Sequence, residues 1–266
     1  MQRFIDVFNT GRETASWTAR PSHEWIRLSS FRGSLRDDAR IQVSIDWASA
    51  PKGVSVSGAV VISGASKSRL VKVTIFNPAT PQPNKLTGFV ESNGVVSIEA
   101  ENFVRRIDRK EVGWRLISGL GRTGNSVAIF PTTATSIDPL QITRDAPVLE
   151  YQIQLFAPGK VNVICNLIPT HPLNVGRGLR YAIGFDDEDP QLVTVGAKLQ
   201  VPSPEWATRV LNAATTGTST HNVRAAGRHV LKVYMVDPGV VLDKIVIDLG
   251  GLRPSYLGPP ETKAGR

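Results

Sequence analysis

The sequence VSIEAENF, which spans Val96–Phe103, decides the expected fold of the second half of this chain. Apolar and polar side chains alternate through it, as they do on the two faces of a β-strand. Glu99 and Glu101 therefore share one face and are separated by a single residue. Two carboxylates so placed repel each other unless a cation, an arginine or a hydrogen-bond network lies between them. The stretch predicts a half-buried strand that carries an acidic pair.

A proline-rich segment precedes this strand and divides the chain. Three prolines in NPATPQPNKL, residues 77–86, bar regular structure and favour a semi-rigid connector. We therefore expect one domain over residues 1–76, a linker over 77–94 and a second domain over 95–251. Residues 252–266 then follow as a tail.

The first 76 residues contain short stretches of β-branched and aromatic residues, separated by glycine, proline and asparagine. This spacing is typical of antiparallel sandwiches, so we expect an immunoglobulin-like β-sandwich. Trp17, Trp25 and Trp47 lie in or beside these strands. Core packing is the favoured role for each, and a platform for sugar stacking is the alternative. The expected strands are FIDVF, ASWTAR, WIRLS, RIQVSIDW, SGAVVIS and RLVKVTIF.

The second domain shows the same pattern and completes an all-β chain. Seven further strand candidates, separated by Pro, Gly and Asp turns, predict a β-sandwich of jelly-roll type. Only Pro204–Ala214 has helical propensity, and a short helix and an extended loop both remain open for it. The seven candidates are VLEYQIQLF, KVNVICNLIP, LRYAIGFDDED, LVTVGAKL, STHNVRAA, RHVLKVYMV and VVLDKIVIDL.

Composition excludes several classes of protein. No run of 18 apolar residues exists, so we expect no membrane span, and the first residues lack the basic-then-apolar order of a signal peptide. The single cysteine, Cys165, precludes an internal disulfide, and its apolar neighbours predict a buried side chain. The N-terminus suits either a cytosolic protein or a piece of a longer chain, and we favour the piece.

The net charge of +8 is unevenly distributed. Residues 1–95 hold 12 basic and 7 acidic side chains, whereas residues 96–251 hold 16 and 15. Because no polybasic block with interleaved aromatics occurs, nucleic acid is not the expected partner. A polyanionic or uronic-acid-bearing polysaccharide suits this diffuse positive charge better.

The sequence contains no complete catalytic motif. Gly119, Gly121 and Gly124 form a literal G-x-G-x-x-G, but NSVAIF, a strand candidate, follows it where a nucleotide site needs a helix. We therefore expect a glycine-rich strand connection there. The acidic run 186–189 before Pro190 predicts a solvated turn rather than a glycosidase pair. By itself the chain is not expected to be an enzyme.

A site for a hard cation has better support. Calcium takes several oxygen ligands, mainly carboxylates and carbonyls. Glu99, Glu101 and Asp243 would supply three carboxylates if the first and last strands of the second domain pair. The alternative is that these are surface acids answered by basic neighbours. Those neighbours are Arg105, Arg106 and Lys244.

Several long blocks of the sequence resemble known families. The order VSIEAENF, PSPEWATRVLN and AAGRHVLKVYMVDPGVVLDKIVID resembles carbohydrate-binding modules of families 6 and 35. The first domain resembles BACON-like and other immunoglobulin-like modules attached to polysaccharide-degrading enzymes. From about residue 4 to 262 the chain looks like the C-terminal region of family 115 glycoside hydrolases, the xylan α-glucuronidases. That likeness rests on FIDVFNTG, VSIDWASAPKGVSVSG, GFVESNGVVSIEAENF, GWRLISGLGRTGNSVAIFP and RPSYLGPPET.

The resemblance implies roles for particular residues. Glu99 and Glu101 match the calcium-ligand strand of the binding modules, and Asp243 matches the Asp of their n-L-D motif. Trp206 matches a tryptophan that stacks on sugar in the loop-end cleft, and Trp114 is our candidate, by position only, for the facing aromatic.

One residue departs from that pattern. The asparagine that precedes L-D in the family, and that hydrogen-bonds the sugar, is replaced by Val241. An apolar side chain cannot supply the donors and acceptor of an amide. The chain therefore lacks this polar contact of the usual cleft.

The resemblance implies a non-catalytic accessory region that binds xylan or glucuronoxylan and carries structural Ca²⁺. The catalytic barrel of those hydrolases has no counterpart here, and the parent protein would be secreted or periplasmic. One alternative is that both domains are structural, shielding the catalytic barrel or forming a homodimer without sugar affinity. A third alternative is the activity of the whole hydrolase, release of 4-O-methylglucuronic acid.

Overall fold

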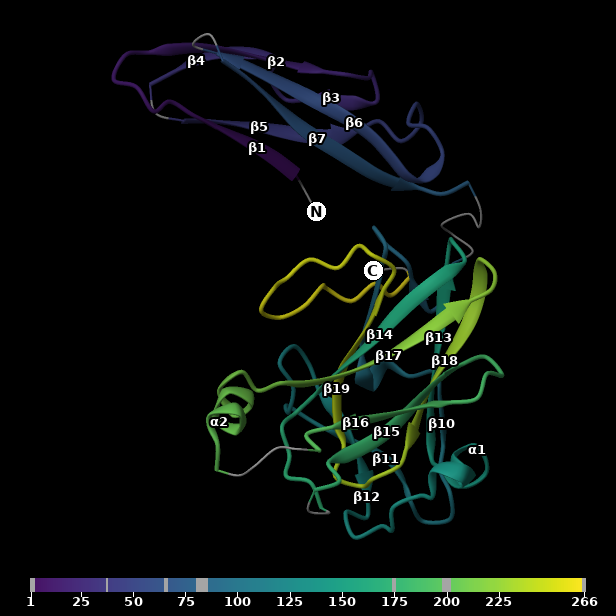
Figure 1. Ribbon diagram of the computed structural model, residues 1–266. Coiled ribbons are helices and arrows are strands. Elements are labelled where there is room, and N and C mark those ends of the chain that lie inside the picture. The colour runs from purple at the N-terminus through teal and green to yellow at the C-terminus, as the bar shows by residue number, and fades with distance from the viewer. Residues whose placement is uncertain are drawn as a thin grey trace. The chain divides into compact units, whose positions relative to one another are not determined.

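The computed structural model describes residues 3–36, 38–64, 67–79, 86–173, 176–197 and 202–264. The chain forms two compact units, residues 1–82 and residues 83–266 (Figure 1). We call them unit 1 and unit 2, and each is described by itself.

The described residues of unit 1 form two antiparallel sheets, one of three strands and one of four. Seven strands divided three and four match the number in an immunoglobulin constant domain, but the order of pairing differs from that type. The three-stranded sheet has the order β1 (Arg3–Phe8), β5 (Asp38–Ile45), β3 (Ile26–Leu28), and the four-stranded sheet has β4 (Arg32–Leu35), β2 (Ala15–Pro21), β6 (Gly53–Gly64), β7 (Lys67–Asn77).

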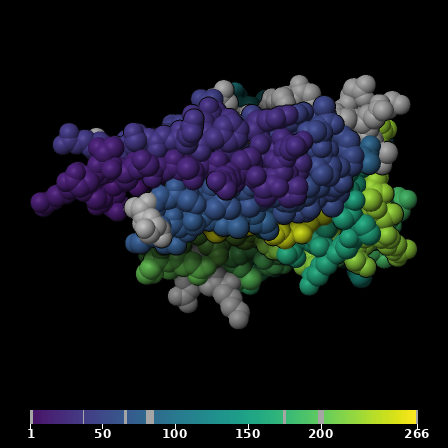
Figure 2. Space-filling model, turned by 90° about the horizontal axis from the view of Figure 1, so that it is seen from above, coloured from purple at the N-terminus to yellow at the C-terminus, as the bar shows by residue number. Residues whose placement is uncertain are grey.

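The two sheets of unit 1 enclose an apolar core. Trp17 and Trp25 are buried in it with Ile41 and Val60, as predicted for the two tryptophans. The same prediction is wrong for Trp47, which lies in the turn after β5 and is 55% exposed. The prediction rested on the position of Trp47 beside a strand. A residue in a turn has no facing sheet to cover it, so its side chain stays exposed. Figure 2 shows one face of unit 1, purple to blue, as a continuous layer of side chains.

Unit 2 contains two larger sheets, each with six strands among the described residues. The β18 sheet has the order β10 (Arg105–Ile107), β13 (Val148–Leu155), β18 (Gly227–Met235), β15 (Leu179–Phe185), β16 (Gln191–Val195), with β8 (Phe89–Val90) beside β13. The β19 sheet has the order β11 (Gly113–Ile117), β12 (Ser126–Phe130), β19 (Val241–Asp248), β14 (Gly159–Leu167), β17 (Thr215–Val223), with β9 (Val95–Glu99) beside β19.

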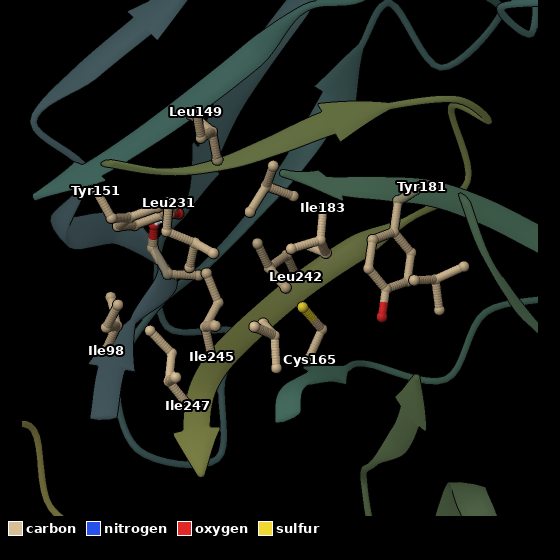
Figure 3. Packing of buried hydrophobic residues seen from close by; sticks show 14 of the residues in the cluster. Ile98, Leu149, Tyr151, Cys165, Tyr181, Ile183, Leu231, Leu242, Ile245 and Ile247 are labelled. Carbon is tan, nitrogen blue, oxygen red and sulfur yellow. Dashed lines mark hydrogen bonds between the residues drawn. The ribbon is translucent and has the colours of Figure 1, made fainter. Parts of the chain in front are cut away.

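Most neighbouring strands of unit 2 are distant in the sequence, so the chain crosses repeatedly between the sheets. Side chains from both sheets point toward one another in a single core (Figure 3). The predicted all-β fold with two sandwich units is confirmed. The core includes Leu149, Tyr151, Tyr181, Ile183 and Leu231 from the β18 sheet and Ile98, Cys165, Leu242, Ile245 and Ile247 from the β19 sheet.

The helices are short, and none in the described part of the chain has the length and apolar character needed to traverse a bilayer. Besides α1 (Ile142–Asp145), unit 2 contains α2 (Pro204–Leu211), which resolves the open alternative in favour of a helix. The Trp206 N–H donates to the Ser203 side chain at its N-terminus, and Arg209 pairs with Glu205 one turn away at 2.6 Å.

The predicted linker over residues 77–94 is too long at both ends. Strand β7 continues to Asn77, and β8 already pairs in parallel with β13. Phe89 is buried, and the Phe156 N–H donates to the Glu91 carboxylate at 2.8 Å. Residues 80–85, with two of the three prolines, lie outside the described residues. The prolines therefore indicate correctly where the two units divide. Strand β8 has only two residues, which is too short for an alternating pattern to show in the sequence.

The predicted separate tail is also wrong, because the segment over residues 259–262 hydrogen-bonds to β9. The Ser97 hydroxyl donates to the Pro259 carbonyl at 2.9 Å, and the Thr262 N–H donates to the Ser97 carbonyl at 2.9 Å. Every residue of β9 is consequently buried, including Glu99. The strand is therefore not half-buried, because a segment far away in sequence covers its polar face.

Candidate functional site

Three carboxylates of unit 2 converge on one loop. Strand β9 pairs antiparallel with β19, so the first and last full strands of the unit meet as expected, with Glu99 opposite Lys244. This pairing places Asp243 near Glu99, and Glu101 follows in the short 3₁₀ helix η2 (Ala100–Asn102). The loop over residues 118–125, which joins β11 to β12, donates hydrogen bonds to all three carboxylates.

The loop contacts are made by successive residues. The Arg122 N–H donates to the two oxygens of Asp243 at 3.3 and 3.4 Å, and the Thr123 hydroxyl donates to Glu99 at 2.9 Å. The Asn125 N–H donates to Glu101 Oε1 at 3.0 Å. Burial raises the pKa of the Asp243 carboxyl above its usual range, and the Arg122 N–H opposes this change.

The glycines of the literal G-x-G-x-x-G explain how the loop comes so close. A Cβ on Gly121 would lie 2.7 Å from Asp243 Oδ1, and a Cβ on Gly124 would lie 2.7 Å from Glu101 Oε1. A larger residue at either position would displace the carboxylate beside it, and glycine leaves room for both. The loop leads into strand β12, so the expected glycine-rich strand connection is confirmed.

Lys244 places a positive charge inside the cluster. Its side chain is 4% exposed, and its Nζ lies 3.0 Å from Glu99 Oε1. The same ammonium donates to the carbonyls of Leu257 and Pro259, both at 3.3 Å, so the C-terminal segment completes its surroundings. Of the basic neighbours considered from the sequence, only Lys244 answers one of these acids, because Arg105 pairs with Glu150 and Arg106 with Asp108.

The fit of this cluster to a metal is mixed. Glu101 Oε2 is buried and has no hydrogen-bond partner among the described residues, which is compatible with a role as a cation ligand. The hydrogen bonds that Asp243 receives from described residues are all long, the third coming from the Ser126 hydroxyl at 3.4 Å. Against this, Glu99 already has a counter-ion, and the described residues contain no group of three or more His, Cys, Asp or Glu side chains placed to hold a metal.

Trp206 lies at a separate position, on α2. Its side chain is partly exposed, and its ring lies 4.3 Å from that of His171, with the planes tilted by 37°. Pro169 and Pro172 line a cavity of only about 10 Å³ beside it. The cavity is too small for a sugar, so any sugar contact would use the outer surface of the indole.

Trp114 cannot face Trp206 across a cleft. It is completely buried in the core on β11, opposite Ile129, and its Nε1–H donates to the Pro147 carbonyl at 3.3 Å. The prediction of a ligand contact at Trp114 is therefore inconsistent with the structure. It rested on position alone, and position in the sequence does not reveal which face of β11 the indole occupies.

Comparisons with known proteins agree with the resemblance read from the sequence. The model of the family described as glycosyl hydrolase family 115 C-terminal domain matches residues 88–261. The comparison with curated proteins yields no match.

Solved structures that resemble the chain include a glucuronidase and carbohydrate-binding modules. A family 115 4-O-methyl-α-glucuronidase with specificity for decorated arabinogalactans is 21% identical over 55% of this chain, with a TM-score of 0.40. The match covers 17% of that glucuronidase. The C-terminal family 6 carbohydrate-binding module of a laminarinase from Zobellia galactanivorans is 17% identical over 58% of this chain and 98% of its own, with a TM-score of 0.37. A family 35 module from Clostridium thermocellum is 11% identical over 57% of this chain and 96% of its own, with a TM-score of 0.36.

Proposed function

Because this chain belongs to the family of C-terminal domains of family 115 glycosyl hydrolases, matched over residues 88–261, we propose that it is a non-catalytic accessory region that binds xylan or glucuronoxylan. The family membership is the observation that carries the proposal. The matched family describes the C-terminal domain of these enzymes rather than their catalytic domain.

Trp206 is the residue proposed to contact the polysaccharide. It is the one of the two candidate tryptophans whose indole reaches the surface, and the capped helix α2 fixes its backbone. An aromatic ring held in this way presents an apolar face to the C–H groups of a sugar ring. The net charge of +8 adds attraction for an acidic xylan.

Replacement of Trp206 by alanine should weaken retention of the chain by glucuronoxylan in affinity gel electrophoresis. We expect a loss of about 1–3 kcal/mol in binding free energy, which is typical of an aromatic anchor. The melting temperature should change little, because the side chain is only partly buried. Added salt should weaken binding to glucuronoxylan more than binding to unsubstituted xylan, since it screens charge attraction beyond ~8 Å at physiological ionic strength.

Phe31→Ala is the matched control, because Phe31 is an exposed aromatic residue in unit 1 that has no proposed sugar contact. Its removal should leave retention unchanged. Equal loss in both variants, or unfolding of the Trp206→Ala variant, would contradict the role proposed for Trp206.

A second candidate function is a structural one, in which the chain mediates contact between protein subunits. The observation that favours it is the apolar surface on α2, where Val210 is 49% and Leu211 is 82% exposed. Such side chains suit a protein interface as well as a sugar site. In that case size-exclusion chromatography should show a dimer that Leu211→Glu converts to a monomer, with no retention by xylan.

We further propose that calcium binds at Glu99, Glu101 and Asp243 and stabilises unit 2. The buried, unpaired Glu101 Oε2 and the long hydrogen bonds to Asp243 support this assignment. Carboxylate oxygens are ligands that Ca²⁺ prefers. The ion would cross-link the ends of β9 and β19 to the loop over residues 118–125.

A further inference from the structure

A pocket of about 300 Å³ lies between the C-terminal segment and the outer face of the β19 sheet. Its floor is formed by side chains of β14 and β19, among them Asn166 and Asp248. Its walls are residues 252–256, Gly258, Pro259 and the side chain of Arg122 from the loop over residues 118–125. We call it the tail pocket. It shares no lining residue with the cavity beside Trp206.

Two guanidinium groups line the tail pocket. Arg122 lies over the ring of Tyr256, with its Cζ 4.7 Å from the ring centroid, and donates from Nη2 to the Tyr256 carbonyl. Its Nε is buried and has no hydrogen-bond partner among the described residues. Arg253 is exposed and makes no hydrogen bond or ion pair with any described residue. Arg253 therefore gives the pocket a guanidinium group that no described residue pairs, and Arg122 adds a second positive charge.

One of the two carboxylate oxygens of the acid in the lining is already engaged. Asp248 Oδ1 accepts hydrogen bonds from the N–H groups of Gly250 at 2.8 Å and Leu252 at 3.0 Å, which fixes the turn into the C-terminal segment. With two arginines and one aspartate, the lining carries a net positive charge. The amide of Asn166 and the hydroxyl of Ser255 make no hydrogen bond with described residues. The 68% exposed ring of Tyr256 adds an apolar surface.

This combination specifies a ligand. Guanidinium groups bind planar carboxylates through paired N–H donors. Amide, hydroxyl and carboxylate side chains beside an aromatic ring are the groups that bind the hydroxyls and C–H face of a sugar. The volume lies at the lower end of the range for small-molecule sites. We propose that the tail pocket binds a carboxylate-bearing sugar, a hexuronic acid, with Arg122 and Arg253 on the carboxylate and Asn166, Ser255 and Asp248 on the hydroxyls.

The proposal does not depend on Trp206, and its test separates the two sites. The full 266-residue chain, labelled with ¹⁵N, is titrated with sodium D-glucuronate at constant ionic strength and followed by NMR. We expect saturable shifts in the backbone amides of Asn166, Ser255 and Tyr256. D-glucose, which lacks the carboxylate, and sodium acetate, which lacks the ring, should each give much weaker shifts. The Trp206→Ala variant should bind glucuronate as the unchanged chain does.

Single substitutions distinguish specific binding in the tail pocket from general attraction to the positive charge of the chain. Arg253→Ala should raise the dissociation constant for glucuronate about tenfold, the effect of losing one charged hydrogen bond. Arg69→Ala, which removes an exposed arginine from β7 in unit 1, should leave it unchanged. Asn166→Ala should weaken glucuronate without affecting acetate.

Two results would overturn the proposal. One is acetate producing the same shifts at the same concentrations, since the pocket would then be a simple anion site. The other is Arg253→Ala and Asn166→Ala binding glucuronate as tightly as the unchanged chain.

Discussion

Replacing Trp114 with alanine should lower the free energy of unfolding of unit 2 by about 3–5 kcal/mol, the usual cost of truncating a buried tryptophan. The indole is completely buried between the sheets, so its removal leaves a cavity lined by core side chains. The Pro147 carbonyl also loses the Nε1–H that it accepts. Urea denaturation followed by circular dichroism measures the change.

Trp206→Ala is the control for this measurement, because it makes the same substitution in the same unit at a partly exposed position. It should shift the urea midpoint much less than Trp114→Ala does. If Trp114→Ala instead kept full stability and lost glucuronoxylan binding, the indole would be a ligand contact and its placement in the core would be wrong.

Replacing Lys244 with methionine should destabilise unit 2 by about 3–5 kcal/mol in the presence of a chelator, because the buried Glu99 carboxylate then has no counter-ion. The Lys244 ammonium lies 3.0 Å from Glu99 and is almost wholly buried, so solvent cannot replace it. Calcium should recover part of this loss. A ligand that binds only the folded state stabilises it by roughly 2.7 kcal/mol at a hundredfold excess over its dissociation constant.

The same melting experiment tests the calcium proposal in the unchanged chain. Chelator should lower its melting temperature, and Glu99→Ala should abolish that shift. Lys160→Met, at an exposed position on β14, is the charge-matched control and should behave as the unchanged chain. The calcium proposal is contradicted if calcium affects neither the unchanged chain nor Lys244→Met and no metal copurifies. In that case Lys244 and the hydrogen-bond donors of the loop are sufficient to stabilise the three carboxylates.

Much of the fold could be predicted because its strands are long enough to show a period. The seven strand candidates after residue 147 each correspond to a strand, β13 to β19. The predicted cation site requires the first and last strands of the second domain to pair, and β9 does pair with β19. Strand β4 was missed, since RGSL shows no apolar alternation. Its Gly33 packs against Trp17, where a Cβ would lie 3.0 Å from the ring.

The candidate site could be predicted only in part. Alternation correctly places Val96, Ile98 and Ala100 in the core, but the strand ends at Glu99, so Glu99 and Glu101 do not share a strand face. Alternation also cannot show that a segment 162 residues away hydrogen-bonds the same strand. The counter-ion Lys244 was named only as one of several basic neighbours, and its burial depends on that same segment. No sequence pattern identifies Arg122 as a binding residue, because the residues around it come from three distant parts of the chain.

Depletion of the whole chain from solution by insoluble glucuronoxylan is the most direct test of the proposed function. The measurement compares the protein left in the supernatant with and without the polysaccharide at low salt, with insoluble cellulose as the uncharged reference. We expect the chain to bind glucuronoxylan, to bind cellulose less, and to be released by salt, as its net charge of +8 requires. A chain that remains entirely in the supernatant at low salt would contradict polysaccharide binding and would leave subunit contact as the function to pursue.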